Sequence, residues 1–188
     1  MPMILELNEV LLEGEPRTLS LMAHERQLTC LTGGTGERLT RWLYGIMGFV
    51  PVKSGFLSID GEPLTAASAE TFRKLMAFAP AQLEMAGEVK TYEPPSVQDV
   101  FNLKANRDLP ISNGILAEEM RKVAAGCEDP RVRLLAVASL LNKPVMLVDD
   151  VLPEAMPYLR MKAVENRIVI VTSQSAEVLE QADVVVEI

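Results

Sequence analysis

A short glycine-rich segment contains the residues whose types and spacing most clearly suggest chemistry. It reads Gly33-Gly34-Thr35-Gly36-Glu37-Arg38-Leu39-Thr40. In the pattern GxxxxGK[ST], backbone amides and a helix N-terminus surround phosphate groups, the lysine contacts the outer phosphates and the hydroxyl binds Mg²⁺. Gly33 and Thr40 match this pattern, whereas Arg38 stands in the second glycine position and Leu39 in the lysine position. The segment therefore predicts a nucleotide-binding loop without its lysine, with the candidate residues Gly33, Gly34, Thr35, Gly36, Arg38, Leu39 and Thr40.

Two charged side chains affect how strongly such a loop would bind a phosphate group. Glu37 places an anion beside the expected phosphate position, and a like-charge contact at a few ångströms costs on the order of 1 kcal/mol. Arg38 could replace the lysine as the phosphate cation, although its planar guanidinium comes one residue early. Alternatively, Arg38 is a solvated residue at the start of a helix. The sequence leaves both interpretations open.

The elements beside this loop indicate a strand, a glycine turn and a helix in succession. Leu28–Thr32 is a strand-like run that ends at Gly33. After the loop, apolar residues recur at helical spacing from Leu39 to Met47. Alternating strands and helices along the chain predict an α/β protein with a mostly parallel sheet flanked by helices.

Two further apolar runs, Val145–Val148 and residues 168–171, read as central strands buried on both faces. The first stops at Asp149-Asp150, and the second is followed by Thr172-Ser173. Carboxylates at a strand end can bind a metal ion or position water, but they are also common as solvated strand caps.

Size, charge and cysteine content limit the classes of function. A chain of 188 residues with 48% hydrophobic and 23% charged residues is typical of one globular domain, here 1–188. Its net charge of -8 disfavours binding to nucleic acid or an anionic membrane through general electrostatics. Cys30 and Cys127 lie far apart without a CxxC pattern, which argues against a zinc site or a disulfide framework.

The apolar segments favour a cytoplasmic protein. The N-terminus has no basic region before its apolar residues, so it does not resemble a signal peptide. The longest apolar stretch, residues 134–148, is interrupted by Asn142-Lys143-Pro144. We therefore expect a helix, a turn and a strand there and no membrane insertion.

The order of motifs along almost the whole chain resembles the ATP-binding domains of ATP-binding cassette (ABC) transporters. Residues 41–48, then Pro51 and residues 54–61, are similar to the family's stretch LLxxLxGLxxPxSGxIxxDG. Residues 72–80 resemble the run that leads into the family's Q-loop, where Ala81 takes the glutamine position and Gln82 follows one residue late. Residues 97–103 resemble the TVxENL segment, where the family's helical subdomain begins.

Two motifs that recognise and cleave ATP in this family are altered. The segment aligned with the signature LSGGQ, residues 124–128, keeps Gly126 but has Ala125 in place of the serine. Residues 168–177 resemble the switch segment, with Ser173 in place of the histidine. Residues 10–15 lack the aromatic residue on which the family stacks adenine. Recognition of ATP across a dimer is therefore expected to be impaired.

The acidic pair fits the family's metal-binding strand. By this resemblance Asp149 and Thr40 would hold Mg²⁺ if a nucleotide binds. Asp150 stands where the family has its catalytic glutamate and is the candidate catalytic residue. Its side chain is shorter by about one carbon–carbon bond, and the geometry that polarises a water tolerates little displacement.

The resemblance implies a P-loop NTPase-like fold with an N-terminal antiparallel β portion and a reduced helical subdomain at about 83–130. ATP and Mg²⁺ are the implied cofactors. Another ABC subunit and a membrane permease are the implied partners, which would place the chain at the cytoplasmic side of the inner membrane.

Three hypotheses of function remain open. The leading one is a subunit with a degenerate nucleotide site, a pseudo-ATPase that pairs with an active ATPase or a permease. The second is a working but atypical ATPase that uses Arg38, Thr40, Asp149 and Asp150. The third is a protein-interaction or regulatory module on the same scaffold, whose loop holds another anion or is covered by a partner.

Overall fold

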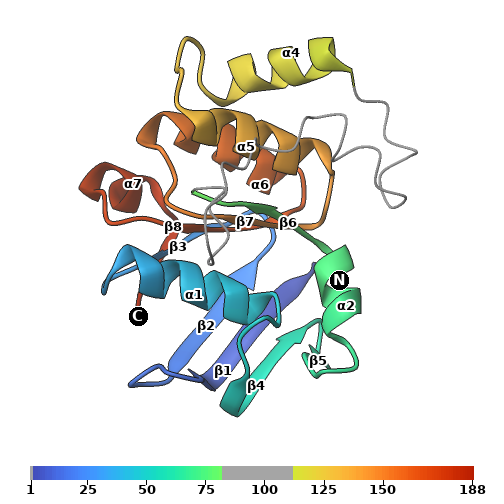
Figure 1. Ribbon diagram of the computed structural model, residues 1–188, viewed down its shortest axis with the longest axis vertical. Helices are drawn as coiled ribbons and strands as arrows, with labels where there is room; N and C mark the ends of the chain where they lie inside the picture. Colours follow the sequence, from blue (N-terminus) through green and yellow to red (C-terminus); the bar gives the residue numbers. More distant parts are fainter. Residues whose placement is uncertain (1, 82–111) are drawn as a thin grey trace, which may run out of the picture.

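The computed structural model describes residues 2–81 and 112–188, which form two β-sheets and the helices that cover them (Figure 1). One sheet has five parallel strands in the order β6-β7-β8-β3-β9, and the other has four antiparallel strands in the order β2-β1-β4-β5. This arrangement confirms the predicted α/β fold class with its N-terminal antiparallel portion. Gln82 and the predicted helical segment 97–103 lie outside the described residues.

The parallel sheet is built from β3 (Leu28–Thr32), β6 (Met76–Ala79), β7 (Val145–Val148), β8 (Ile168–Thr172) and β9 (Val184–Glu187). Every residue of β7 and β8 is buried, as the sequence predicts for central strands. Val145 and Leu147 contribute to the core on one face, whereas Met146 and Val148 contribute to the core on the other. The two-residue period of a strand thus connects both cores through the same short segments.

Helices cover the two faces of this sheet differently (Figure 1). One face packs against α5 (Pro130–Leu140), α6 (Met156–Val164) and α7 (Ala176–Gln181), and α4 (Asn113–Val123) packs in turn on α5 and α6. A short 3-10 turn, η2 (Pro153–Ala155), precedes α6. The other face packs against α1 (Gly36–Ile46), α2 (Ala69–Lys74) and the antiparallel sheet. Of the predicted subdomain 83–130, the described part therefore includes α4.

The antiparallel sheet consists of β1 (Ile4–Leu12), β2 (Leu19–His24), β4 (Val52–Ile59) and β5 (Glu62–Pro63). It contacts α1 closely, because a Cβ atom added at Gly45 would lie only 2.4 Å from Leu12 Cδ1. A side chain at this position would therefore displace Leu12. The close approach places the end of β1 against the last turn of α1.

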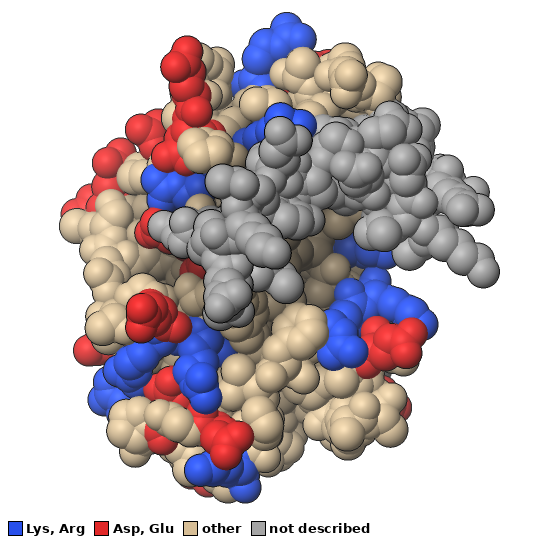
Figure 2. Space-filling view, viewed as in Figure 1, with Lys and Arg blue, Asp and Glu red and all other residues tan. Residues whose placement is uncertain are grey.

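Among residues 2–81 and 112–188, no helix combines the length and the apolar character needed to cross a membrane. On the face shown in Figure 2, described Lys and Arg side chains lie beside Asp and Glu side chains.

Candidate functional site

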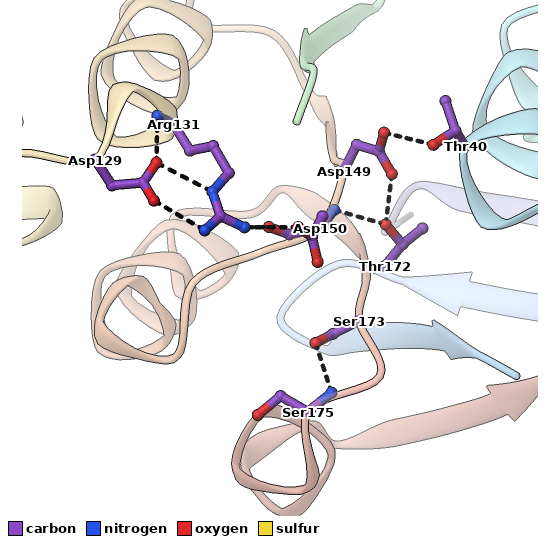
Figure 3. Close-up of polar contacts among 8 residues, drawn as sticks. All are labelled: Thr40, Asp129, Arg131, Asp149, Asp150, Thr172, Ser173 and Ser175. Carbon is purple, nitrogen blue, oxygen red and sulfur yellow. Dashed lines mark hydrogen bonds and ion pairs between the residues drawn. The ribbon is translucent and has the colours of Figure 1, made fainter. Parts of the chain in front are cut away.

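The polar candidates meet at the edge of the parallel sheet where its strands end. Asp149 directly follows β7, Thr172 is the last residue of β8, and Thr40 lies in α1 after β3 (Figure 3). Because parallel strands place their carboxyl ends at the same edge, residues far apart in sequence converge there. This edge is the candidate site.

Asp149 is the centre of the converging group. Its side chain is buried, with the residue 6% exposed, and both carboxylate oxygens accept hydrogen bonds. The Thr40 hydroxyl lies 2.7 Å from Oδ2 and the Thr172 hydroxyl lies 2.7 Å from Oδ1 (Figure 3). Two strand ends and a helix are therefore joined through one carboxylate. The hydrogen bonds from the two hydroxyls replace those that the buried carboxylate would make with water.

The glycine loop between β3 and α1 is short. Gly33 and Gly34 adopt left-handed backbone conformations, with φ of 87° and 63°, and α1 begins at Gly36. Thr35 caps the helix, because its hydroxyl accepts a 3.4 Å hydrogen bond from the backbone amide of Arg38. The Gln174 side chain donates a 2.7 Å hydrogen bond to the Gly34 carbonyl, so the loop is also held from the segment after β8.

Leu39, in the lysine position, faces the protein interior. It is 3% exposed and belongs to the core between α1 and the parallel sheet, together with Trp42 and Leu43. The side chain at this position therefore packs as part of the helix's apolar face. It supplies no charge or hydrogen bond to the loop.

Arg38, the other candidate cation, is bound to an acidic residue from a distant turn. Its Nε and Nη2 donate hydrogen bonds of 3.1 and 2.8 Å to Oε2 of Glu15. The Glu15 side chain is only 2% exposed, and Arg41 Nε lies 3.7 Å from its other oxygen. In the sequence, Glu15 stands in the segment 10–15 that lacks an aromatic residue, and no local pattern there indicates this pairing.

Asp150 points away from Asp149 and Thr40, toward α5 (Figure 3). Its Oδ2 lies 2.6 Å from Arg131 Nη1, and the same nitrogen donates a 2.9 Å hydrogen bond to the Asp150 carbonyl. The backbone amide of Asp150 donates to the Thr172 hydroxyl at 2.8 Å, with φ of 46°. The side chain is 64% exposed. The carboxylate is thus directed to an arginine of the neighbouring helix.

Arg131 in turn is held by Asp129, which caps the N-terminus of α5. Two side-chain contacts join them, Nε to Oδ1 at 3.1 Å and Nη2 to Oδ2 at 2.9 Å. These hydrogen bonds lower the pKa of Asp129 below its ordinary value and raise that of Arg131. The guanidinium therefore stays charged and connects two carboxylates.

The remaining candidates lie around this centre. Ala125 and Gly126 belong to the loop that joins α4 to α5. Ser173 is buried at 3% exposure, and its hydroxyl accepts a 3.1 Å hydrogen bond from the Ser175 amide at the start of α7 (Figure 3). In the described part of the chain, Ser173 makes a local capping contact there, whereas Thr172 beside it takes part in the central group.

The donor atoms fit the two implied ligands unequally. The oxygens of Thr40 and Asp149 are hard ligands of the kind Mg²⁺ prefers. Within residues 2–81 and 112–188, however, no group of three or more His, Cys, Asp or Glu side chains could hold a metal ion by itself. For phosphate, Leu39 offers no cation and Arg38 already pairs with Glu15. The magnesium ligands fit, and the phosphate cation does not.

The comparison with known proteins rests on structure. No protein-family model matches the sequence, and no curated protein matches it either. Among solved structures, a bacterial Atm1-family ABC exporter with ATP bound matches 100% of the chain with a TM-score of 0.74 and 13% identity. CbiO1 from Clostridium perfringens, part of the ABC transporter complex cbiONQ, matches 100% of the chain with a TM-score of 0.69 and 13% identity.

A third solved structure, an ATP-binding subunit of an ABC transporter, matches 98% of the chain with a TM-score of 0.70 and 15% identity. The chain spans 37% of the exporter's length and 85% of each of the other two. At these identities the likeness concerns the fold, which is that of the ATP-binding subunits of ABC transporters.

Proposed function

We propose that this chain is an ABC-type subunit with a degenerate nucleotide site, which does not hydrolyse ATP by itself. It acts as a structural or regulatory partner of an active ATPase subunit or of a permease. The observation that carries the proposal is the absence of a free cation from the residue pair 38–39 of the glycine loop, since Leu39 is in the core and Arg38 is paired with Glu15.

Electrostatics explain why this pair matters. A triphosphate brings several negative charges into a loop whose neighbour, Glu37, is also acidic. Backbone amides at a helix N-terminus favour anions by about 0.3–1 kcal/mol at an exposed surface. This stabilisation is small compared with the loss of the attraction to a lysine and with the repulsion from the like-charged Glu37. Weak or absent binding of ATP is the expected consequence.

The catalytic position supports the same proposal. A carboxylate that orients water must face the place where the phosphate reacts. Asp150 instead contacts Arg131 and is 64% exposed. Turning its side chain toward Thr40 would break the 2.6 Å contact between Oδ2 and the Arg131 guanidinium. Hydrolysis by this chain alone is therefore not expected.

The partners follow from the fold. CbiO1 is described as part of a transporter complex, and the exporter is itself an ABC transporter. By analogy, we propose that this chain pairs with a second ABC subunit and a permease, which would place it at the cytoplasmic side of the inner membrane. Expression together with the subunits encoded beside its gene tests this point. We expect co-elution, and a chain that always purifies alone would contradict it.

Calorimetric titration of Mg²⁺–ATP into the protein tests the nucleotide site. We expect no saturable binding up to millimolar ATP and no phosphate release above the buffer background. A thermal unfolding curve of the same sample establishes that the protein is folded. Binding in the micromolar range would overturn the proposal.

A second candidate function is a working but atypical ATP-binding cassette. The contact of 2.7 Å between Thr40 and Asp149 favours it, because these oxygens retain the arrangement of a magnesium site. In this case ATP binding would require Mg²⁺, and Asp149→Asn would abolish it. The proposed function predicts that neither the wild type nor Asp149→Asn binds ATP, with or without Mg²⁺.

A further inference from the structure

A buried carboxylate lies between two arginines of α1, next to the glycine loop. Glu15 accepts two hydrogen bonds from Arg38 through one oxygen, while its other oxygen lies 3.7 Å from Arg41 Nε. The Glu15 side chain is 2% exposed, against 30% for Arg38 and 40% for Arg41. The acid is thus the buried member, and both guanidinium groups reach inward to it.

The turn that carries Glu15 is itself fixed on α1. The amide of Glu15 donates to the Leu12 carbonyl at 3.1 Å, which closes the turn after β1. Arg41 Nη2 donates to the Glu13 carbonyl, and a Cβ atom added at Gly14 would lie 3.0 Å from the same nitrogen. Turn and helix therefore meet without space between them.

The Arg38 guanidinium also lies against the loop. A Cβ atom added at Gly34 would be 2.8 Å from Arg38 Nη1. The side chain therefore extends back from α1 across the loop backbone to reach Glu15. Guanidinium groups bind carboxylate and phosphate by the same planar, charge-assisted hydrogen bonds. A phosphate entering here would meet a cation that already holds an acid.

We propose that Glu15 is a built-in anion that occupies Arg38 and Arg41 and so keeps the glycine loop closed to phosphate groups. This inference rests on the proposed function, because it gives a specific reason for the absence of nucleotide binding. Removal of the Glu15 charge frees a guanidinium that is already in contact with the loop. The loop then gains a cation without any change to Leu39.

The alternative is that the three residues are a structural ion pair with no bearing on anions. The two cases differ in the effect of neutralising Glu15. Glu37→Gln is the matched control, because it removes one negative charge from the first turn of α1, next to Arg38, without freeing an arginine. The double variant Glu15→Gln with Arg38→Met removes the freed guanidinium as well.

The experiment is a calorimetric titration of sodium tripolyphosphate into the wild type and the three variants at low ionic strength. We expect E15Q to bind at least about tenfold more tightly than both the wild type and E37Q, since the freed guanidinium can donate charge-assisted hydrogen bonds to the phosphate groups. We expect the gain to disappear in the double variant. Equal affinities of E15Q and E37Q, or a gain that persists without Arg38, would overturn the inference.

Two arrangements keep the test decisive. If thermal unfolding shows that E15Q does not fold, Glu15→Asp replaces it, because the shorter acid keeps its charge but loosens its hold on Arg38. A gain of about threefold over the wild type, which carries the same net charge, is then expected, and no gain counts against the inference. Tight Mg²⁺–ATP binding by the wild type would contradict the proposed function. A wild type that does not bind and an E15Q variant that gains nothing would contradict this inference alone.

Discussion

The metal side and the phosphate side of the candidate site differ in how their polar groups are used. On the metal side, Thr40, Asp149 and Thr172 form a closed set of contacts at 2.7 Å. On the phosphate side, Leu39 is in the core and Arg38 reaches a distant acid. The difference indicates that the hydroxyl–carboxylate contacts also serve the fold, because they join two strands and a helix. A loop lysine lacks such a structural role.

The acidic pair repeats this contrast between two adjacent residues. Asp149 is buried and contacts two hydroxyls, whereas Asp150 is 64% exposed and contacts one arginine. Their positions at the end of β7 differ by a single residue, yet they face different elements.

The largest effect is expected at Leu39. Leu39→Lys places a charge in the core beside Trp42, so we expect the free energy of unfolding to fall by about 3 to 5 kcal/mol. Leu39→Met, which keeps the apolar volume, should cost less than about 1.5 kcal/mol. Urea unfolding followed by circular dichroism measures both.

The same argument applies to a repaired loop. Arg38→Gly combined with Leu39→Lys restores the GK pattern. The new lysine, however, would replace a side chain that is buried in the core. We therefore expect an unstable protein without ATP binding. If the double variant is stable and binds ATP in the micromolar range, the loop must rearrange. The residues at positions 38 and 39 would then be the only cause of the lost ATP binding.

An intermediate effect separates the two adjacent carboxylates. Asp149→Asn weakens two contacts to a buried charged group, and we expect a loss of about 1.5 kcal/mol. Asp150→Asn removes a partly exposed ion pair and keeps a residue type that tolerates its positive φ, so less than about 1 kcal/mol is expected. Chemical unfolding of both variants measures the difference. Equal losses would contradict the assigned difference between the two positions.

The smallest effect concerns pH. Because hydrogen bonds from Arg131 lower the pKa of Asp129 in the folded protein, this pair stabilises the fold above the unfolded value of about 3.9. That stabilisation is lost as the pH falls through the lower folded value. We expect Arg131→Met to be less stable than the wild type by under about 1 kcal/mol at neutral pH. The difference should shrink below about pH 4.

Carboxyl carbon NMR titration provides the direct measurement of this last prediction. The Asp129 signal should titrate below the ordinary aspartate range in the wild type and move up toward that range in Arg131→Met. An unchanged Asp129 titration in the variant would exclude Arg131 as the cause of the shift.

Much of the fold could be predicted because its signals are local. The apolar runs of β3, β7 and β8 and the helical spacing after Leu39 each lie within a few residues. The structure confirms the parallel sheet that they predicted and the antiparallel portion implied by the family resemblance. The same local pattern explains the burial of Leu39, which occupies an apolar position of α1.

The pairings of the candidate site could be predicted less well. Thr40 and Asp149 were expected to act together because of the family resemblance, and their side chains do meet. The Glu15–Arg38 pair joins residues with no shared local pattern, and the direction of Asp150 depends on Arg131 from another helix. The roles of these residues toward a nucleotide remain predictions.

The sequence by itself determined which residues could form the loop, the strands and the acidic end of β7. It did so because backbone conformation and apolar periodicity depend on near neighbours. Only the tertiary structure decided which charge each polar side chain meets. Ion pairs depend on distances of a few ångströms between segments far apart in the chain, and the packing of the β1 turn and of α5 sets those distances.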